Sequence, residues 1–284
     1  INKIADSGKR VIVIVPEQFS FDFDRKLYKK LKSRLFNKIL SLSFTTMAKE
    51  IFEKYGSRSG EYADDMHKYI IMHKTVKKLL SDKQIKYFTR QAVRPDFISS
   101  ALKIVAEFRQ SGVSADDFIS KMCSENNSFT EKISDLSMIY YTYNSMLSDN
   151  NLKDSLTDIS EAAAIAEING YFKDSVVFFD EFESFTGDEY QLIDTIIGQS
   201  DDVYISLRLE NADNHSADLF DSVKNTWKRF YQISKKYGIQ IKAINLIRPI
   251  KYRNEDLVHL NKNIFRPERK RFGKSENIRI CECH

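Results

Sequence analysis

The 284-residue sequence is poor in the residues that build loops, repeats and membrane spans. It contains only 9 Gly and 4 Pro, which argues against a disordered chain, a collagen-like repeat or a loop-rich disulfide scaffold. No stretch approaches the ~20 apolar residues that a membrane-spanning helix needs, and no charged-then-apolar leader is present. We therefore expect a cytoplasmic protein that does not enter a membrane.

Cysteine is scarce as well, with only Cys123, Cys281 and Cys283. An odd number of cysteines without a secretory leader favours reduced thiols in the cytoplasm. The closing C-x-C-H sequence has a spacing too short for a C-x2-C metal knuckle and lacks a second pair of ligands. Because Ile278 and Ile280 alternate into this sequence, a strand is the favoured interpretation there.

Excess charge of one sign is nearly missing. The sequence has 44 basic and 40 acidic residues, so its net charge is only +4. A contact with nucleic acid must then use a local basic patch and not a uniformly basic surface. The five histidines show no metal-ligand spacing, and neither H-E-x-x-H nor G-x-S-x-G occurs, which argues against metalloprotease and α/β-hydrolase chemistry.

What the sequence does contain is an alternation of strand and helix patterns towards both ends. Residues 11–15, VIVIV, are β-branched and closed by a proline, which predicts a buried parallel strand. A helical pattern follows, then a short strand over 39–43 and a helix that Thr45 or Thr46 caps and Gly56 ends. Further strands, separated by helical patterns, are expected at 175–179, 203–209 and 239–246. This order is typical of an open α/β sheet.

Between the two strand regions, residues 61–168 show helical periodicity and no convincing strand. Pro95 stands where a first helical turn tolerates proline, Gly112 stands where a C-terminal cap belongs, and a later helix ends at Gly170. A long block without strands inside an α/β chain predicts an all-helical insertion.

The sharpest local motif is VVFFDEFESFT, residues 176–186. An apolar strand that delivers two acids matches the Walker B pattern of P-loop NTPases, in which Asp180 would hold Mg²⁺ and Glu181 would orient the attacking water. Acids are also common at ordinary strand ends. The phosphate-binding sequence G-x-x-x-x-G-K-[ST] does not occur, and Gly8 is interpreted as a turn because it precedes its strand. We therefore expect no ordinary ATP site within these residues.

Four segments resemble the AddB family, in the same order along the chain. V-P-E-Q-F-S-F at 15–21 is similar to the family's strand that ends in V-P-x-Q. I-L-S-L-S-F-T-T-M-A-K-E-I-F at 39–52 looks like its strand, S-F and helix element. A-E-F-R-Q-S-G-V-S-A-D-D-F at 106–118 is similar to a stretch of its helical insert. F-F-D-E-F-E-S-F-T-G-D-E-Y-Q-L-I at 178–193 resembles its strand followed by F-T-x-x-E.

The resemblance implies a RecA-like domain of the superfamily 1 helicase type, residues 1–57 and 169–284, interrupted by a helical insert domain at 58–168. It implies the start of a longer subunit, which pairs with an AddA-type helicase–nuclease subunit to process double-strand breaks for recombinational repair and contributes to recognition of the Chi sequence. A 4Fe-4S cluster and exonuclease activity are expected only in a C-terminal nuclease domain outside these residues. The resemblance also implies that family members often carry a P-loop before the V-P-x-Q strand, and a chain that opens with Ile1 would begin just after it. The sequence leaves open whether a P-loop precedes Ile1, and whether the intact subunit hydrolyses ATP with Mg²⁺ or only binds it.

Candidate DNA contacts follow the predicted strands, as in helicase cores of this type: Gln18, Phe19, Ser20, Ser43, Phe44 and Thr45. Aromatic rings stack on bases, and hydroxyls and amides bond phosphates. Gln18 is also a candidate for contact with a nucleotide or a Mg²⁺-bound water. For Phe19 or Phe44 taken alone, core packing is the favoured alternative. The densest basic cluster, RPERKRFGK at 266–274, adds Arg269, Lys270 and Arg271, with a solvated surface as the alternative.

The combined features predict a part that helps the holoenzyme grip and scan DNA and assemble, as a scaffold more than a motor. We expect no nuclease or unwinding activity from these residues alone. One alternative is an active ATP-dependent motor domain, which uses Asp180 and Glu181 with an upstream P-loop. Another is a protein-interaction scaffold that binds AddA without touching DNA.

Overall fold

The computed structural model describes residues 9–31, 39–92, 94–111, 128–208, 221–244, 254–264, 270–279 and 281. The chain falls into two compact units, residues 1–208 and residues 209–284. No helix in the described part is long and apolar enough to cross a bilayer.

The first unit is built on a four-stranded parallel sheet with the strand order β2-β1-β5-β6. β1 (Arg10–Ile14) lies between β2 (Ile39–Leu42) and β5 (Ser175–Phe179), and β6 (Asp202–Ile205) pairs with β5. Residues 11–15 are fully buried, as expected for a central strand of β-branched residues. The predicted α/β class with a parallel sheet is confirmed.

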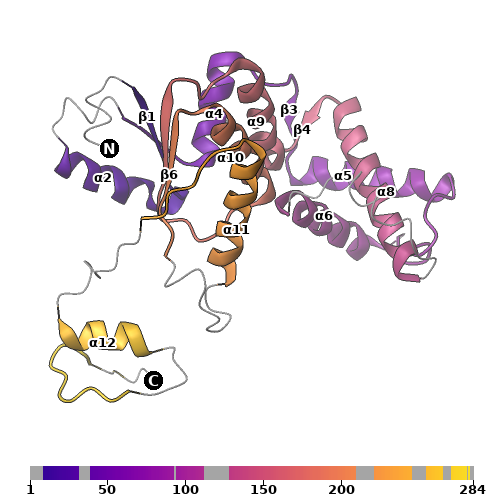
Figure 1. Cartoon of the computed structure of the whole chain (residues 1–284). Coiled ribbons are helices and arrows are strands. Elements are labelled where there is room, and N and C mark those ends of the chain that lie inside the picture. Colours follow the sequence, from indigo (N-terminus) through magenta and orange to yellow (C-terminus); the bar gives the residue numbers. More distant parts are fainter. Residues whose placement is uncertain are drawn as a thin grey trace. The chain divides into compact units, whose positions relative to one another are not determined.

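The helices described in this unit, in chain order, are η1 (Glu17–Phe19), α2 (Ser20–Lys30), α4 (Phe44–Tyr55), α5 (Asp65–Ser81), α6 (Pro95–Gln110), α8 (Ser128–Asp149), η2 (Ser155–Thr157), α9 (Asp158–Asn169) and α10 (Gly187–Gln199). Helices lie on both sides of the sheet (Figure 1). On one face, Phe23 of α2 packs with the side chains of Val11, Val13 and Val15. On the other side, α9 packs against both α4 and α10.

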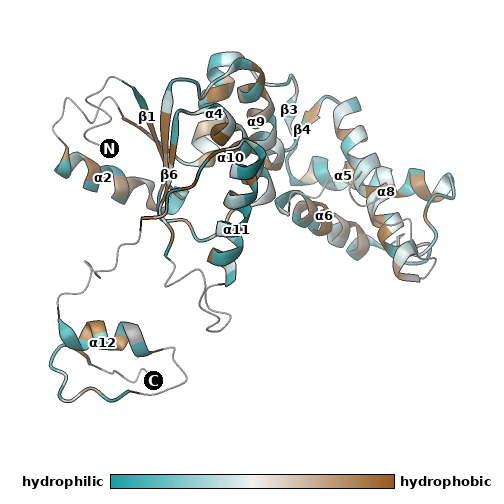
Figure 2. Ribbon diagram, in the orientation of Figure 1, coloured by the Kyte–Doolittle hydropathy of each residue, from teal (hydrophilic) through white to brown (hydrophobic). Residues whose placement is uncertain are grey.

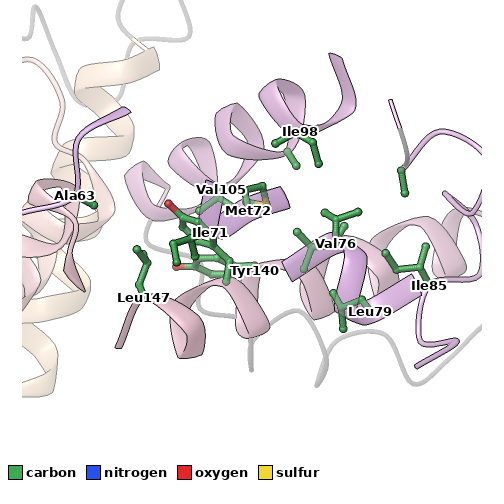
Figure 3. Packing of buried hydrophobic residues seen from close by; sticks show 14 residues of the cluster. Ala63, Ile71, Met72, Val76, Leu79, Ile85, Ile98, Val105, Tyr140 and Leu147 are labelled. Atoms are coloured by element: carbon green, nitrogen blue, oxygen red, sulfur yellow. The ribbon is translucent and has the colours of Figure 1, made fainter. Parts of the chain in front are cut away.

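The chain between β2 and β5 is mostly helical, and α5, α6 and α8 enclose an apolar core of their own (Figure 3). Met72, Ile98 and Tyr143 are among its almost fully buried side chains. The expectation of no strand in this stretch is wrong, because β3 (Glu61–Tyr62) and β4 (Leu152–Lys153) form a short parallel pair. Two-residue strands are too short to show an alternating pattern. The division of the chain at residues 57 and 168 stays a prediction.

Several predicted helix ends are confirmed. Pro95 stands in the first turn of α6, where its missing N–H costs no hydrogen bond. Gly170 ends α9 in the left-handed conformation, with φ +64°. Gly112, the expected cap of α6, lies outside the described residues; Ser111 follows the last residue of that helix.

The second unit contains α11 (Asp221–Lys236) and α12 (Glu255–Asn263). The Asp256 carboxylate accepts hydrogen bonds from the backbone N–H groups of Leu257 and Asn277 and from the Ser275 hydroxyl. Burial acts to raise the pKa of Asp256, but these hydrogen bonds outweigh it and lower the pKa to about 2. Asp256 therefore fastens the start of α12 to residues 275–277.

Three strand predictions in the last third of the chain need correction. β6 ends at Ile205, although the pattern predicted a strand as far as residue 209. Residues 239–244 and 278–279 form no strand, although their apolar residues alternate. Ile239, Ile241 and Ile244 are exposed. Alternation indicates a strand only where a neighbouring strand bonds to its backbone, and local sequence does not show that neighbour.

Candidate functional site

The carboxyl ends of all four parallel strands meet at one edge of the sheet. The backbone ladder continues one residue past β1, where the Val15 N–H donates to the Leu42 carbonyl at 3.0 Å. It also continues past β5, where the Asp180 N–H donates to the Ile14 carbonyl at 3.1 Å. Asp180 therefore lies between the ends of β1 and β6, as its place after a buried strand predicts.

Asp180 is half-buried and accepts a hydrogen bond from the hydroxyl of Ser206, the first residue after β6. Both residues border a pocket of about 210 Å³ on the α2 side of the sheet, whose other lining residues are Val13, Phe23, Phe178, Phe179, Tyr204 and Ile205. The rings of Phe178 and Tyr204 stack there, with centroids 4.8 Å apart. The pocket thus has an aromatic wall and a polar rim of one carboxylate and one hydroxyl.

Glu181, the second acid, has an unusual backbone conformation and pairs with a cation. Its φ of +64° lies in the left-handed region, which a residue other than glycine rarely adopts. Its carboxylate forms an ion pair with the guanidinium of Arg208, whose side chain is 67% exposed.

The residues that follow β2 have a structural role at the start of α4. Ser43 caps α4: its hydroxyl accepts from the Thr46 N–H at 3.2 Å, and its own N–H donates to the Thr46 hydroxyl at 2.7 Å. The cap is therefore Ser43 and not Thr45 or Thr46, since the helix already begins at Phe44. Thr45 is exposed at the start of the helix.

Phe44 is only 3% exposed, which leaves its ring no free face for a base. It belongs to a cluster of four phenylalanines, in which its centroid lies 6.2 Å from that of Phe179, 5.7 Å from Phe182 and 5.9 Å from Phe185. The structure thus places this candidate in the core, in agreement with the alternative interpretation.

The F-T-x-x-E element is a helix start. The Thr186 hydroxyl accepts from the Glu189 N–H at 3.3 Å, and the Thr186 N–H donates to the Glu189 carboxylate at 2.7 Å. This reciprocal pair is a capping box, which fixes where α10 begins. Its residue types follow from helix capping and do not require a catalytic role.

The candidates after β1 occupy the short helix η1 and the first residue of α2. Gln18 and Phe19 are exposed, Phe19 by 41%. The Ser20 hydroxyl donates to the Glu17 carbonyl at 2.9 Å. Phe19 is the candidate aromatic residue that keeps an accessible ring, while Gln18 does not line the pocket beside Asp180.

The basic candidates lie in the second unit. Lys270 and Arg271 are exposed, and the Lys270 carbonyl is 2.8 Å from Nε2 of His259. Arg269 lies outside the described residues.

A buried ionic network, which the sequence did not reveal, joins α5 and α6 to the residue before η2. Arg109 of α6 is 6% exposed; it pairs with Asp154 and donates to Asn144 Oδ1 at 2.5 Å. Lys68 of α5 reaches the same Asp154 at 2.8 Å. Burial raises the pKa of Asp188, at the start of α10, to about 6, although the nearby positive charge of Arg109 opposes the rise. One sequence feature could have indicated that Arg109 is buried: it is an isolated arginine on the apolar side of a predicted helix.

The chemistry of the edge fits a magnesium-bound nucleotide only in part. Asp180 and Ser206 are oxygen ligands of the kind that Mg²⁺ prefers, and they adjoin each other. Among the described residues, no group of three or more His, Cys, Asp or Glu side chains could hold a metal ion by itself. The amides of a phosphate-binding loop are missing from the sequence, so the phosphates have no cradle here.

The family described as "ADDB, N-terminal" matches residues 2–261. Similar curated proteins are named as the B subunit of an ATP-dependent helicase/deoxyribonuclease. The one from Clostridium kluyveri is 31% identical over 96% of this chain and 24% of its own length. Those from Clostridium botulinum strain Hall and Ruminiclostridium cellulolyticum are 25% and 27% identical, over 97% and 83% of this chain and 24% and 21% of their own lengths. The chain spans about a quarter of the length of the curated relatives it matches.

Proposed function

The chain belongs to the AddB N-terminal family, and from this premise we propose that it is the helicase-like beginning of an AddB-type subunit that processes DNA double-strand breaks for recombinational repair. Its sheet and helices form a RecA-like domain with a helical insert. It works in the cytoplasm beside an AddA-type helicase–nuclease subunit, and it grips and scans DNA as a scaffold more than as a motor.

The observation that carries this proposal is the state of the two acids at the carboxyl edge of the sheet. Asp180 is bonded to Ser206 and Glu181 to Arg208, while no phosphate-binding loop occurs in residues 1–284. A helicase-like sheet edge without a phosphate cradle supports a DNA-holding role. Phe19 and Thr45, exposed after neighbouring strands, offer a ring and a hydroxyl to a single strand.

Fluorescence anisotropy of the chain on labelled single-stranded and duplex DNA, across a salt series, tests the proposal. We expect an affinity that falls steeply between about 50 and about 200 mM salt, because phosphate contacts release counterions. Phe19→Ala should weaken single-strand binding, whereas Tyr87→Ala, which removes a similarly exposed ring from the helical region, should not. Absence of binding even at low salt would reject DNA gripping and leave a scaffold that only docks on AddA.

An active motor is the second candidate, and the position of Asp180 favours it. β6 pairs with β5 alone among the described strands, so a further parallel strand carrying a phosphate-binding loop would find an edge one strand away from Asp180. ATPase assays of the complete subunit test this. Loss of ATP hydrolysis in Asp180→Asn, with DNA binding kept, would support the motor; equal hydrolysis by both proteins would reject it.

A further inference from the structure

The exposed side of helix α11 combines positive charge with tyrosine. Five of its 16 residues are basic and one is acidic, so this helix carries a surplus of four positive charges, as large as the net charge of the whole chain. Figure 2 shows that hydrophilic residues dominate its ribbon. The local basic patch that a nearly neutral sequence requires for nucleic-acid contact is therefore present here.

The basic residues share one side of the helix. Steps of three and four residues join Lys228, Tyr231 and Lys235, and residues at these spacings lie above one another on a helix. All three are exposed. The buried residues occupy the opposite side: Val223, Thr226, Phe230, Ile233 and Ser234. Lys228, Tyr231 and Lys235, called the α11 row below, thus form an outward surface on a rigid element.

Within the α11 row, cation and ring are already adjacent. The Lys235 ammonium lies 4.7 Å from the centre of the Tyr231 ring, and Tyr231 is 47% exposed. At the next residue, the Lys236 ammonium lies 4.9 Å from the Tyr237 ring. A ring that is accessible beside an ammonium matches the alternation of base and phosphate along a single strand.

We propose that the α11 row binds single-stranded nucleic acid, with Lys228 and Lys235 on phosphates and Tyr231 stacked on a base. The two lysines are seven residues apart, about 10 Å along the helix axis, so they reach different phosphates. A single strand fits better than a duplex because its base faces are free for Tyr231. Charge alone would suit an acidic protein equally, but the interleaved tyrosine favours nucleic acid. The inference rests on the proposed function, since it names a surface through which the chain holds DNA.

The first test removes charge from the row of the full chain. We expect Lys228→Gln/Lys235→Gln to lower affinity for a labelled oligothymidylate about tenfold at low salt. The slope of log K against log salt should fall by about 0.7 for each lysine removed. The matched control is Lys74→Gln/Lys77→Gln, which removes two exposed lysines from α5 and should leave the slope unchanged.

The second test separates stacking from charge. Tyr231→Phe keeps the ring and should bind the oligothymidylate like the parent chain, whereas Tyr231→Leu should bind about tenfold more weakly. Only the leucine variant should lose preference for single strands over duplex. All these positions are exposed, and circular dichroism checks that each variant is folded.

The outcomes distinguish this inference from the proposed function. If the parent chain binds DNA and the α11 variants bind it as well as the α5 control does, the inference fails and the proposed function stands. If the parent does not bind DNA at all, both fail. If the lysine variants lose an AddA-type partner but keep the oligothymidylate, the α11 row is a protein contact and the inference is overturned.

Discussion

The sheet and the helical region between β2 and β5 are held together in different ways. The sheet buries apolar side chains, and its backbone groups bond between strands. The helical region also has an apolar core, but two buried carboxylates bind its loops. Asp135, 2% exposed, accepts the N–H groups of residues 86, 87 and 88 at 2.8–3.2 Å, and Asp154 receives Arg109 and Lys68.

This difference in how the two regions are stabilised indicates which kinds of substitution will destabilise each of them. In a parallel sheet, backbone groups satisfy one another, so stability depends mainly on packing volume. Helices connected by irregular segments leave backbone N–H groups that need side-chain acceptors, and removing one partner of a buried charge leaves the other uncompensated. We therefore expect polar changes to be most harmful in the helical region and volume changes in the sheet.

The largest effect is expected for Arg109→Leu. It leaves the Asp154 carboxylate, 4% exposed, with Lys68 as its remaining cation, and should lower the free energy of unfolding by about 3–5 kcal/mol. Urea denaturation followed by circular dichroism measures the change. Arg90→Leu, at an exposed position, is the control and should change stability by less than about 0.5 kcal/mol. If both variants change the free energy of unfolding by the same small amount, the buried charges do not stabilise the helical region as proposed.

Phe44→Leu tests the sheet side. Loss of ring volume from the phenylalanine cluster should cost about 1–2 kcal/mol, because the cavity is only partly refilled. Affinity for single-stranded DNA, measured under conditions where the variant is folded, should not change. A folded variant with unchanged stability and weakened DNA binding would restore Phe44 as a DNA contact.

Asp188→Asn examines the junction between the two regions. The pKa of Asp188 is raised from 3.8 to about 6, so the folded state holds the proton more tightly than the unfolded state does. The stability that this protonation contributes is complete below about pH 4 and lost as the pH rises to about 6. The asparagine variant should therefore gain on the order of 1 kcal/mol over the parent across this window. A constant difference from pH 4 to 7 would contradict the assignment.

The smallest effect is expected for Arg208→Gln. Its ion pair with Glu181 is exposed on the arginine side, and such pairs contribute less than about 1 kcal/mol. Thermal unfolding should hardly shift, and Glu181→Gln should behave in the same way. A loss of more than about 2 kcal/mol would mean that the acid edge is part of the framework of the sheet.

Local pattern was sufficient for much of the fold and for one part of the site. The β-branched run at 11–15 predicted the central strand, Gly170 predicted a helix end, and the apolar strand before Asp180 placed that acid at the carboxyl edge. Each is a local effect, because side-chain branching, left-handed backbone and strand position act over a few residues.

Local sequence pattern gave wrong predictions where the structure of a segment depends on residues far away in the sequence. Residues 239–244 alternate like a strand but pair with none of the strands that the structure describes, whereas β3 and β4 pair although neither shows a pattern. Phe44 follows a strand, as a DNA contact would, but three other phenylalanines enclose it.

By itself, the sequence determined the parallel α/β class, the helical nature of the long middle stretch and the family to which the chain belongs, because these depend on periodicity and on the order of short motifs. Only the tertiary structure decided that Ser206 and Arg208 bind the two acids, that Asp154 gathers Arg109 and Lys68, and that the lysines of α11 face outward beside a tyrosine. Those outcomes depend on which side chains meet after the chain has closed on itself. The residue types determine charge and hydrogen-bonding capacity, but tertiary packing determines which residues become partners.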